Sequence, residues 1–209
     1  MSRVSIIDHP MVQHKLTILR DKNTSSKQFR ELVKELALFE GYEATKDFEL
    51  SETEIETPME KTKAYEISGK KVALVPILRA GLGMVEGLLE LVPVARVGHI
   101  GMYRDPDTHE PVEYYAKFPQ DIESRIVLIL DPMLATGGSA SAAIKYMRDL
   151  GVKDIKLLVI LAAPEGIQEV LESDPDVQIF TCAIDKGLDE HAYIVPGLGD
   201  AGDRIFGTK

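Results

Sequence analysis

The chain has 209 residues, enough for one α/β domain with a sizeable core, and its 44% of hydrophobic and 28% of charged residues exclude a disordered protein. Its net charge of −10 argues against nucleic acid as a partner, because proteins that bind nucleic acids usually carry a basic face. The single cysteine, Cys182, excludes an intrachain disulfide, and we find no signal core and no apolar run of membrane-spanning length, so we expect a cytoplasmic protein without a membrane partner.

The N-terminal part is predicted to form two helices and one strand. Residues 11–20 carry apolar side chains at helical spacing, and a second helix is expected from a cap at Ser25 or Ser26 to about Tyr42. The apolar stripe of this second helix comprises Phe29, Leu32, Val33, Leu36 and Phe39. Alternating side chains at residues 54–57 indicate an edge strand that ends before a proline.

From residue 70 onward, buried strands alternate with helices. Strands are expected at residues 72–78, 97–102, 125–130, 155–162 and 177–183, and helices at residues 84–91, 139–150 and 165–171. This alternation predicts an α/β fold built from βαβ units, with a mostly parallel central sheet flanked by helices. Ligands of such sheets bind at the carboxyl ends of the strands, so the residues that follow each strand are the first candidates for function.

A glycine-rich turn joins the strand at residues 125–130 to the next helix. It runs Asp131-Pro132-Met133-Leu134-Ala135-Thr136-Gly137-Gly138-Ser139. Its small residues allow a phosphate to approach the helix N-terminus, where backbone N–H groups and the hydroxyls of Thr136 and Ser139 can donate hydrogen bonds. Asp131 can accept hydrogen bonds from ribose hydroxyls. The turn contains no lysine and therefore no Walker A motif, so it suits one monophosphate on a ribose, although a bare Thr-Gly-Gly would equally be a tight turn.

Two arginines are candidates for binding a diphosphate. Arg79 follows the strand at residues 72–78, and Arg104 begins a segment, to about Phe118, that we expect to be mobile and hood-like. A guanidinium stays charged and binds phosphate oxygens in bidentate fashion, although an isolated arginine is more often part of a surface ion pair. The glycines at positions 81, 83 and 87 allow a competing dinucleotide-binding interpretation, but the third glycine comes one residue late.

The C-terminal segment Gly197-Leu198-Gly199-Asp200-Ala201-Gly202 matches the pattern G-x-G-x-x-G. Only seven residues follow it, too few for the helix and second strand of a βαβ unit, which excludes a dinucleotide site here. A flexible terminal loop is one interpretation of this segment.

Several motifs, in order along nearly the whole chain, resemble those of type I phosphoribosyltransferases and in particular their uracil branch. They are Asp8-His9-Pro10, His14-Lys15-Leu16-Thr17, Arg20-Asp21-Lys22-Asn23-Thr24, Pro76-Ile77-Leu78-Arg79-Ala80-Gly81, Tyr103-Arg104-Asp105, the turn from Asp131 to Ser139, and the segment from Tyr193 to Arg204. Type I members usually show two adjacent acids at the strand end, whereas Asp131 is followed by Pro132, as in the uracil branch. The resemblance implies one phosphoribosyltransferase domain over residues 1–209, with a hood formed by the N-terminal helices and residues 182–209.

The resemblance implies that uracil and 5-phosphoribosyl 1-diphosphate (PRPP) are joined to UMP and diphosphate in pyrimidine salvage. It implies catalytic roles for Asp200, Arg79 and Arg104. The implied PRPP-binding residues are Arg79, Arg104, Asp131, Pro132, Met133, Leu134, Ala135, Thr136, Gly137, Gly138, Ser139 and Asp200. The implied uracil-binding residues are Ile194, Gly199, Asp200 and Ala201, with backbone atoms of residues 194, 199 and 201 meeting the base edge.

Partners follow from the same resemblance. It implies Mg²⁺ that is held by the diphosphate and waters, because the second acid is missing and the five histidines show no metal-ligand spacing. It also implies a homo-oligomer, as a dimer or larger assembly, and GTP as an activator. An RNA-binding regulator of pyrimidine genes on the same fold is the alternative function, and it would need a basic face that a net charge of −10 argues against.

Overall fold

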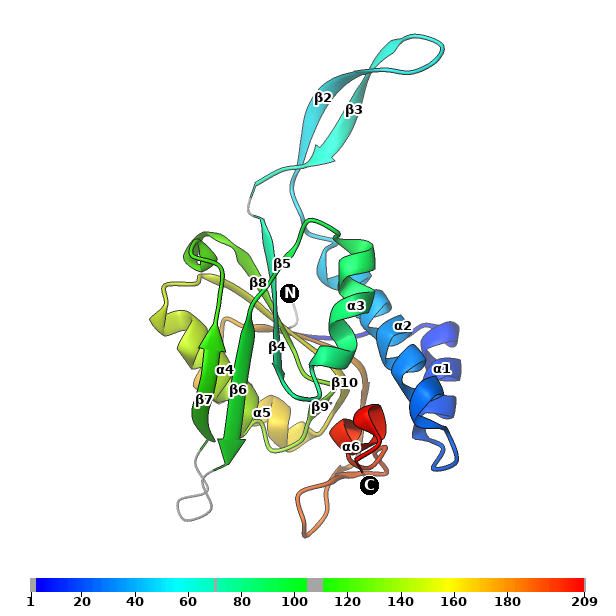
Figure 1. The fold of residues 1–209 in the computed structure, drawn as a ribbon, viewed down its shortest axis with the longest axis vertical. Helices are drawn as coiled ribbons and strands as arrows, with labels where there is room; N and C mark the ends of the chain where they lie inside the picture. Colours follow the sequence, from blue (N-terminus) through cyan, green and yellow to red (C-terminus); the bar gives the residue numbers. More distant parts are fainter. Residues whose placement is uncertain (1–2, 70, 105–110, 209) are drawn as a thin grey trace.

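The computed structural model describes residues 3–69, 71–104 and 111–208. A central sheet carries helices on both faces, and a two-stranded hairpin extends away from it (Figure 1). The helices are α1 (Pro10–Arg20), α2 (Ser26–Ala44), α3 (Leu82–Leu91), α4 (Gly138–Asp149), α5 (Pro164–Ser173) and α6 (Ala201–Phe206), with one 3-10 turn, η1 (Ile122–Ser124). The strands are β1 (Val4–Ile6), β2 (Leu50–Glu56), β3 (Lys61–Ile67), β4 (Val72–Leu78), β5 (Arg96–Val97), β6 (His99–Arg104), β7 (Pro111–Lys117), β8 (Ile126–Leu130), β9 (Met133–Leu134), β10 (Asp154–Ala162), β11 (Gln178–Ile184), β12 (Gly187–Leu188) and β13 (Ile194–Val195).

The central sheet has the strand order β1-β11-β10-β8-β4-β6-β7, with β5 beside β4 and β9 beside β10. Neighbouring strands run parallel except β6 and β7. This topology confirms the predicted α/β fold with a mostly parallel central sheet flanked by helices. Because parallel strands end at one edge of a sheet, β4, β8 and β11 bring Arg79, Asp131 and Asp185 to the same edge.

Both faces of the sheet are buried, which explains the continuous apolar runs in the sequence. Along β8, Leu128 and Leu130 belong to the core beneath α1, α2, α3 and α6. The alternate residues Val127 and Ile129 belong to the core beneath α4 and α5. Successive side chains of a strand point to opposite faces, so most residues of a doubly covered strand are apolar.

The two predicted N-terminal helices are confirmed. The structure decides between the two candidate caps of α2, because the Ser25 side chain accepts a hydrogen bond from the Gln28 N–H at 3.3 Å. Phe29 and Leu36 of the predicted apolar stripe are fully buried. None of the helices in residues 3–69, 71–104 and 111–208 combines the length and hydropathy needed to cross a bilayer.

The predicted strand around residues 54–57 is part of β2, but it does not lie at the edge of the central sheet. β2 pairs with β3 in a separate antiparallel hairpin, in register from Leu50 opposite Ile67 to Glu56 opposite Lys61. The sequence reasoning missed β3, because most of its side chains are exposed and therefore carry no apolar period. The hairpin points away from the edge of the sheet that carries Asp131 (Figure 1).

The segment expected to form a mobile hood is corrected for residues 111–117. These residues form β7, which pairs antiparallel with β6 and makes the outer strand of the sheet, with Tyr115 opposite Gly101. Residues 105–110 lie outside the described part of the chain.

A carboxyl group is buried in the core between α2 and the sheet. The Glu40 side chain is 0% exposed, its Oε1 accepts a hydrogen bond from the Cys182 thiol at 3.6 Å, and its Oε2 has no partner among the described residues. Burial raises the pKa of Glu40 well above its ordinary value, and the thiol bond opposes this only in part.

Replacing Glu40→Gln should stabilise the protein increasingly as the pH rises. A carboxyl whose pKa is raised by folding binds its proton more tightly in the folded chain, so its contribution to stability falls as the pH rises above the ordinary value. Thermal unfolding of E40Q and the wild type at pH 5 and pH 9 measures the difference. Glu31→Gln, on the exposed side of the same helix, is the control, and an equal response of both variants would contradict the prediction.

Candidate active site

A cavity of about 220 Å³ lies at the carboxyl edge of the sheet. Three segments that are far apart in the sequence line it. They are Ala80 after β4, residues Asp131, Met133 and Ala135 of the glycine-rich turn, and residues Ala192, Tyr193, Ile194, Gly199, Asp200, Ala201 and Gly202 of the C-terminal segment. The segments that the sequence singled out for ribose phosphate and for the base therefore meet at one cavity.

Asp131 follows β8 directly and lines this cavity. Its Oδ1 accepts a hydrogen bond from the Met133 N–H at 3.3 Å, and its own N–H donates to the Leu158 carbonyl on β10 at 3.2 Å. Burial raises the pKa of Asp131 to about 7, and the bond from Met133 offsets this only in part. Above that pH the carboxylate is a strong acceptor for hydroxyl groups that enter the cavity.

Two residues in the first half of the glycine-rich turn face the interior and anchor the turn to the sheet. Pro132 and Leu134 are buried, and their carbonyls accept hydrogen bonds from the N–H groups of Leu161 and Ala163 at 3.1 and 2.8 Å. These bonds attach the turn to β10. Residues 135–139, which include the start of α4, are the part of the turn that we expect to face a ligand.

The end of the turn forms the N-terminus of α4. Gly137 is the N-cap and has a φ of 87°, a conformation that favours glycine, and a Cβ there would lie 2.8 Å from the Gly166 carbonyl oxygen. Among the described side chains none caps this helix. The first N–H groups of a 12-residue helix are therefore available to an anion, with the hydroxyl-bearing Thr136 and Ser139 on either side of the glycines.

The loop that carries Arg79 packs against the end of β8. A Cβ on Gly81 would lie 2.3 Å from the Leu130 carbonyl oxygen, so only glycine permits this approach. The Leu78–Arg79 peptide bond is cis. The Arg79 guanidinium carbon lies 5.5 Å from the centroid of the Phe206 ring on α6. Its N–H groups form no hydrogen bond or ion pair with a described residue, so they stay available to anionic oxygens.

The dinucleotide interpretation of the glycines after Arg79 is not supported. A Cβ on Gly87 would lie 2.1 Å from the Lys34 carbonyl oxygen, so this glycine serves the close packing of α3 on α2. Gly83 faces the side chains of Val33 and Ile205 at 3.2 and 3.0 Å. These glycines lie between helices and not beside a cavity.

Arg104 is the last residue of β6, where it pairs with Pro111 of β7. Its side chain lies outside the described part of the structure. Its role in diphosphate binding and catalysis stays a prediction.

The C-terminal glycine loop is bracketed by β13 and α6, which does not fit a flexible tail. Ile194 and Ala201 are each 4% exposed, whereas Gly199 and Asp200 are exposed at the cavity rim. Asp200 is the N-cap of α6, because its Oδ1 accepts a hydrogen bond from the Asp203 N–H at 2.8 Å. The side chain predicted to be catalytic thus also fixes the start of α6.

Sequence reasoning missed two kinds of residue around the cavity. Ala192 and Tyr193 line it, and Tyr193 belongs to the C-terminal motif but was given no role in the site. Arg20 and Asp185 support the loop from outside. Arg20 belongs to the motif at residues 20–24, but its pairing with Asp185, 165 residues away, left no local signal.

The described side chains that could ligate a metal do not form a site that would hold one without help from a substrate. No cluster of three or more His, Cys, Asp or Glu able to hold a metal occurs in the part of the chain that the structure describes. Asp131 is followed by a buried proline, so the turn offers one carboxylate where two adjacent acids would offer a pair.

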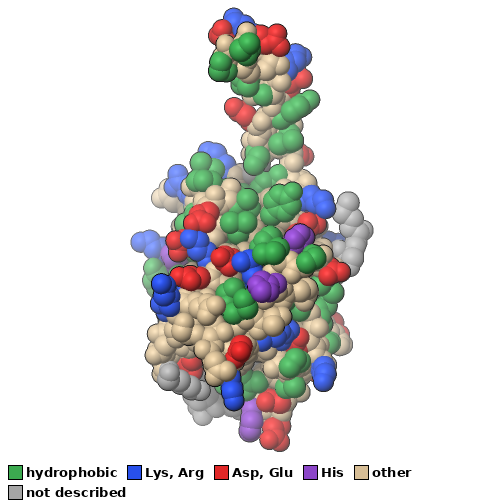
Figure 2. Space-filling model, turned by 90° about the vertical axis from the view of Figure 1, so that its right-hand side faces the viewer, with side chains coloured by type: hydrophobic (Ala, Val, Ile, Leu, Met, Phe, Trp, Pro, Cys, Tyr) green, Lys and Arg blue, Asp and Glu red, His purple; other side chains and the backbone are tan. Residues whose placement is uncertain are grey.

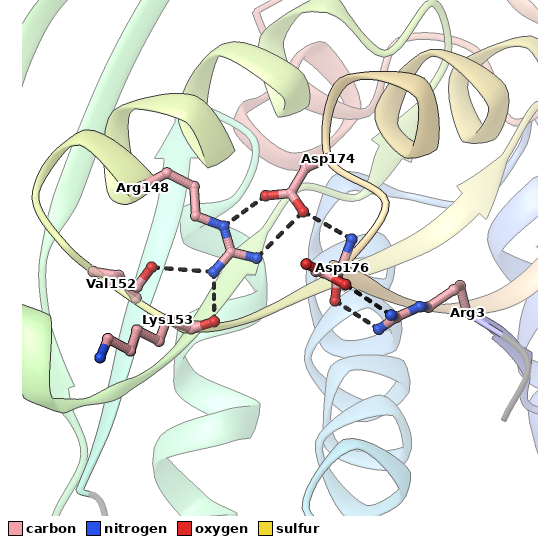
Figure 3. Close-up of polar contacts among 6 residues, drawn as sticks. All are labelled: Arg3, Arg148, Val152, Lys153, Asp174 and Asp176. Carbon is pink, nitrogen blue, oxygen red and sulfur yellow. Dashed lines mark hydrogen bonds and ion pairs between the residues drawn. The ribbon is translucent and has the colours of Figure 1, made fainter.

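A larger cleft, of about 930 Å³, lies at the opposite edge of the sheet, beside the first residues of β8, β10 and β11. Arg148 there is paired with Asp174, and Arg3 with Asp176 (Figure 3). Lys156 there is paired with Asp47, whereas Lys153 has no ion pair among the described residues. The smaller cavity differs in having an uncapped helix N-terminus beside it, which makes it our candidate phosphate site.

Solved structures of low sequence identity share this fold. Adenine phosphoribosyltransferase from Trypanosoma brucei superposes with a TM-score of 0.61 at 12% identity, covering 96% of this chain and 89% of that chain. A hypoxanthine-guanine phosphoribosyltransferase from Bacillus anthracis gives a TM-score of 0.52 at 15% identity, covering 79% and 81%. At such identities the likeness concerns the fold alone, and that fold is the one of type I phosphoribosyltransferases.

Sequence comparison identifies the family within this class. The family model of uracil phosphoribosyltransferase matches residues 6–208. Curated uracil phosphoribosyltransferases from Alkaliphilus oremlandii and Clostridioides difficile are 61% and 59% identical over 209 residues, covering 100% of both chains in each case. A solved Aquifex aeolicus protein superposes with a TM-score of 0.91 at 38% identity, covering 97% of each chain. The chain belongs to the uracil phosphoribosyltransferase family.

Proposed function

We propose that this chain is a pyrimidine-salvage enzyme that transfers the phosphoribosyl group of PRPP to N1 of uracil, giving UMP and diphosphate. The observation that carries the proposal is the single cavity where the Arg79 loop, the glycine-rich turn and the C-terminal loop meet. The 61% identity to a curated uracil phosphoribosyltransferase over the full chain supports the choice of base.

PRPP fits the phosphate side of the cavity. The N–H groups at the start of α4 and the hydroxyls of Thr136 and Ser139 would bind its 5-phosphate, where the helix dipole favours negative charge. Asp131 would accept hydrogen bonds from the ribose hydroxyls. Arg79, and by resemblance Arg104, would bind the diphosphate, whose negative charge grows as it leaves.

Uracil fits the C-terminal side of the cavity. Its edge offers acceptor O4, donor N3–H and acceptor O2, and backbone groups at Ile194, Gly199 and Ala201 can meet these atoms without side-chain obstruction. Cytosine reverses two of these partners. Each reversed partner would leave a buried group unpaired, at a cost of about 1–3 kcal/mol.

The chemistry requires little covalent participation by the protein. The bond from ribose C1 to the diphosphate oxygen breaks, and its electron pair leaves with the diphosphate. Uracil N1 forms a bond to C1 from the opposite face, with inversion, as C1 gains oxocarbenium character. Asp200 lies at the cavity rim, where its carboxylate can accept the proton that N1 loses. The enzyme aligns the substrates and excludes water that would hydrolyse PRPP.

Mg²⁺ enters this proposal as part of the substrate, bound to the PRPP diphosphate and to waters. Asp131, the one carboxylate of the turn, would act on the ribose side of that complex. The N-terminal helices and residues 182–209 would form the hood, and the β6–β7 hairpin would bring Arg104 toward the diphosphate.

The direct test is the formation of UMP by the purified protein from uracil and PRPP with Mg²⁺. Cytosine, hypoxanthine and orotate in separate reactions are the controls. We expect product from uracil and at most traces from the other bases. Absence of UMP with an intact fold would overturn the proposal.

The RNA-binding alternative is not favoured. The 61% identity is to a protein named as an enzyme, and a net charge of −10 opposes a basic RNA-binding face.

We also propose that the protein acts in the cytoplasm and that GTP activates it, as the resemblance implies.

We further propose that the protein forms a homo-oligomer. The hairpin of β2 and β3 supports the oligomer, because an isolated two-stranded hairpin is marginal in water. Met59 is 91% exposed, Tyr65 69% and Ile67 64%, and hydrophobic side chains are visible on the hairpin in Figure 2. A second copy would cover them, and light scattering of the wild type at several concentrations measures its mass.

The KM for PRPP should rise as the pH falls below about 7. The pKa of Asp131 is raised to about 7, and protonation removes the acceptor that the ribose hydroxyls need. Between pH 8 and pH 6 we expect an increase of about tenfold. The Asp131→Asn variant should have a high KM for PRPP that lacks the part of the pH dependence caused by Asp131. Steady-state kinetics of both proteins separates this part from the pH dependence caused by the titration of PRPP itself. Equal pH dependence in both would contradict the assignment.

Asp200→Asn should lower kcat strongly while leaving the fold and the KM for uracil almost unchanged. Asparagine caps helices about as well as aspartate, so the start of α6 is kept while the charge is lost. We expect a loss of about 10²-fold or more in kcat, the range of general acid–base effects. Initial rates and thermal unfolding of D200N and D203N are the measurements, with D203N as the control on the same helix. Unchanged turnover of D200N would remove the catalytic role.

A further inference from the structure

An ion pair outside the cavity holds the backbone of the C-terminal loop. Arg20, the last residue of α1, donates from Nη1 and Nη2 to the two carboxylate oxygens of Asp185, each at 2.7 Å. Arg20 Nη1 also donates to the Gly197 carbonyl at 2.8 Å, and Asp185 Oδ2 accepts from the Gly197 N–H at 2.9 Å. Both polar groups of one residue, Gly197, are thus bound by the two members of one ion pair.

The Arg20–Asp185 ion pair can hold the Gly197 backbone in one position. The side chains of Arg20 and Asp185 are 24% and 6% exposed, so the pair is largely shielded from water. A planar guanidinium that binds a carboxylate through two nitrogens has little rotational freedom. Asp185 is itself anchored, because it directly follows β11 and its N–H donates to the Ala162 carbonyl at 2.9 Å.

The next peptide group of the loop is held in a similar way. Arg204 Nη1 donates to the Leu198 carbonyl at 2.8 Å, and Nη2 donates to the Asp21 carbonyl at 2.5 Å. The Arg204 guanidinium carbon lies 4.4 Å from the centroid of the Phe29 ring. The carbonyls of residues 197 and 198 are therefore occupied from outside the cavity, immediately before residues 199–201, which line it.

We infer that Arg20 and Asp185 are positioning residues for the base: by binding the N–H and carbonyl of Gly197 they hold the backbone of residues 199–201 in the orientation that recognises uracil. The inference rests on the proposed function, because it concerns the base-binding side of the same cavity. Neither residue lines that cavity, although Arg20 lines an adjoining pocket that shares Tyr193, Gly199 and Asp200 with it. In this inference both residues act through the loop. Small displacements of a recognition group weaken binding and slow the reaction together.

A second arginine–aspartate pair in the same chain provides a matched control. Arg148 Nε donates to Asp174 Oδ2 at 2.6 Å, its Nη1 donates to the Val152 carbonyl at 3.1 Å and to the Lys153 carbonyl, and the two side chains are 27% and 11% exposed (Figure 3). Burial and bonding resemble those of the Arg20 pair. The control pair lies at the opposite edge of the sheet, where it borders the larger cleft.

The test compares Arg20→Lys with Arg148→Lys. Lysine keeps the positive charge but loses the two-nitrogen fork. Both variants should lose similar thermal stability, but only R20K should raise the KM for uracil, by about tenfold or more, with the KM for PRPP changing less than about threefold. In addition, amide hydrogen exchange of residues 197–202 should accelerate in R20K and not in R148K.

The double variant R20K/D185N completes the design. If the pair acts as one unit, the double variant should bind uracil no more weakly than R20K alone. Equal uracil KM values for R20K and R148K, or a rise in KM shared equally by PRPP and uracil, would overturn the inference while the wild type still makes UMP. A wild type that makes no UMP would instead overturn the proposed function, and with it the kinetic part of this inference.

Discussion

The site depends on the close approach of Gly81 to the carbonyl of Leu130. A Cβ at position 81 would lie 2.3 Å from that oxygen, so the loop after β4 can cross the end of β8 only because this residue is glycine. The crossing brings Ala80 and Asp131 to one cavity, next to the N-terminus of α4. The parallel part of the sheet imposes the rest, since its parallel strands deliver their carboxyl ends to this edge.

Binding of an anion to this chain depends on a few local groups and not on its net charge. A net charge of −10 disfavours anions in general, so the anion site that we propose is built locally, from the N–H groups of α4 and the guanidinium of Arg79. In the larger cleft, Arg3 and Arg148 are paired with aspartates. The uncapped N-terminus of α4, and not cavity size, is why we propose that the phosphorylated ribose binds at the smaller cavity.

The sequence predicted those features that local patterns encode. The buried strands are continuous apolar runs, and the strand-to-helix turn from Asp131 to Ser139 is contiguous, so both could be read directly. β3 escaped prediction because its side chains are exposed. Local patterns also could not show that Pro132 and Leu134 are buried against β10, because that depends on a partner strand. The pairing of Arg20 with Asp185 spans 165 residues and exists only after folding.

The central claim is that one cavity holds the phosphate at the turn and the base at the C-terminal loop. A crystal structure of the protein with UMP tests it most directly. We expect the 5-phosphate at residues 136–139 and the uracil edge against the backbone of residues 194 and 199–201. A phosphate bound in the larger cleft, or a base that does not contact the C-terminal loop, would contradict it.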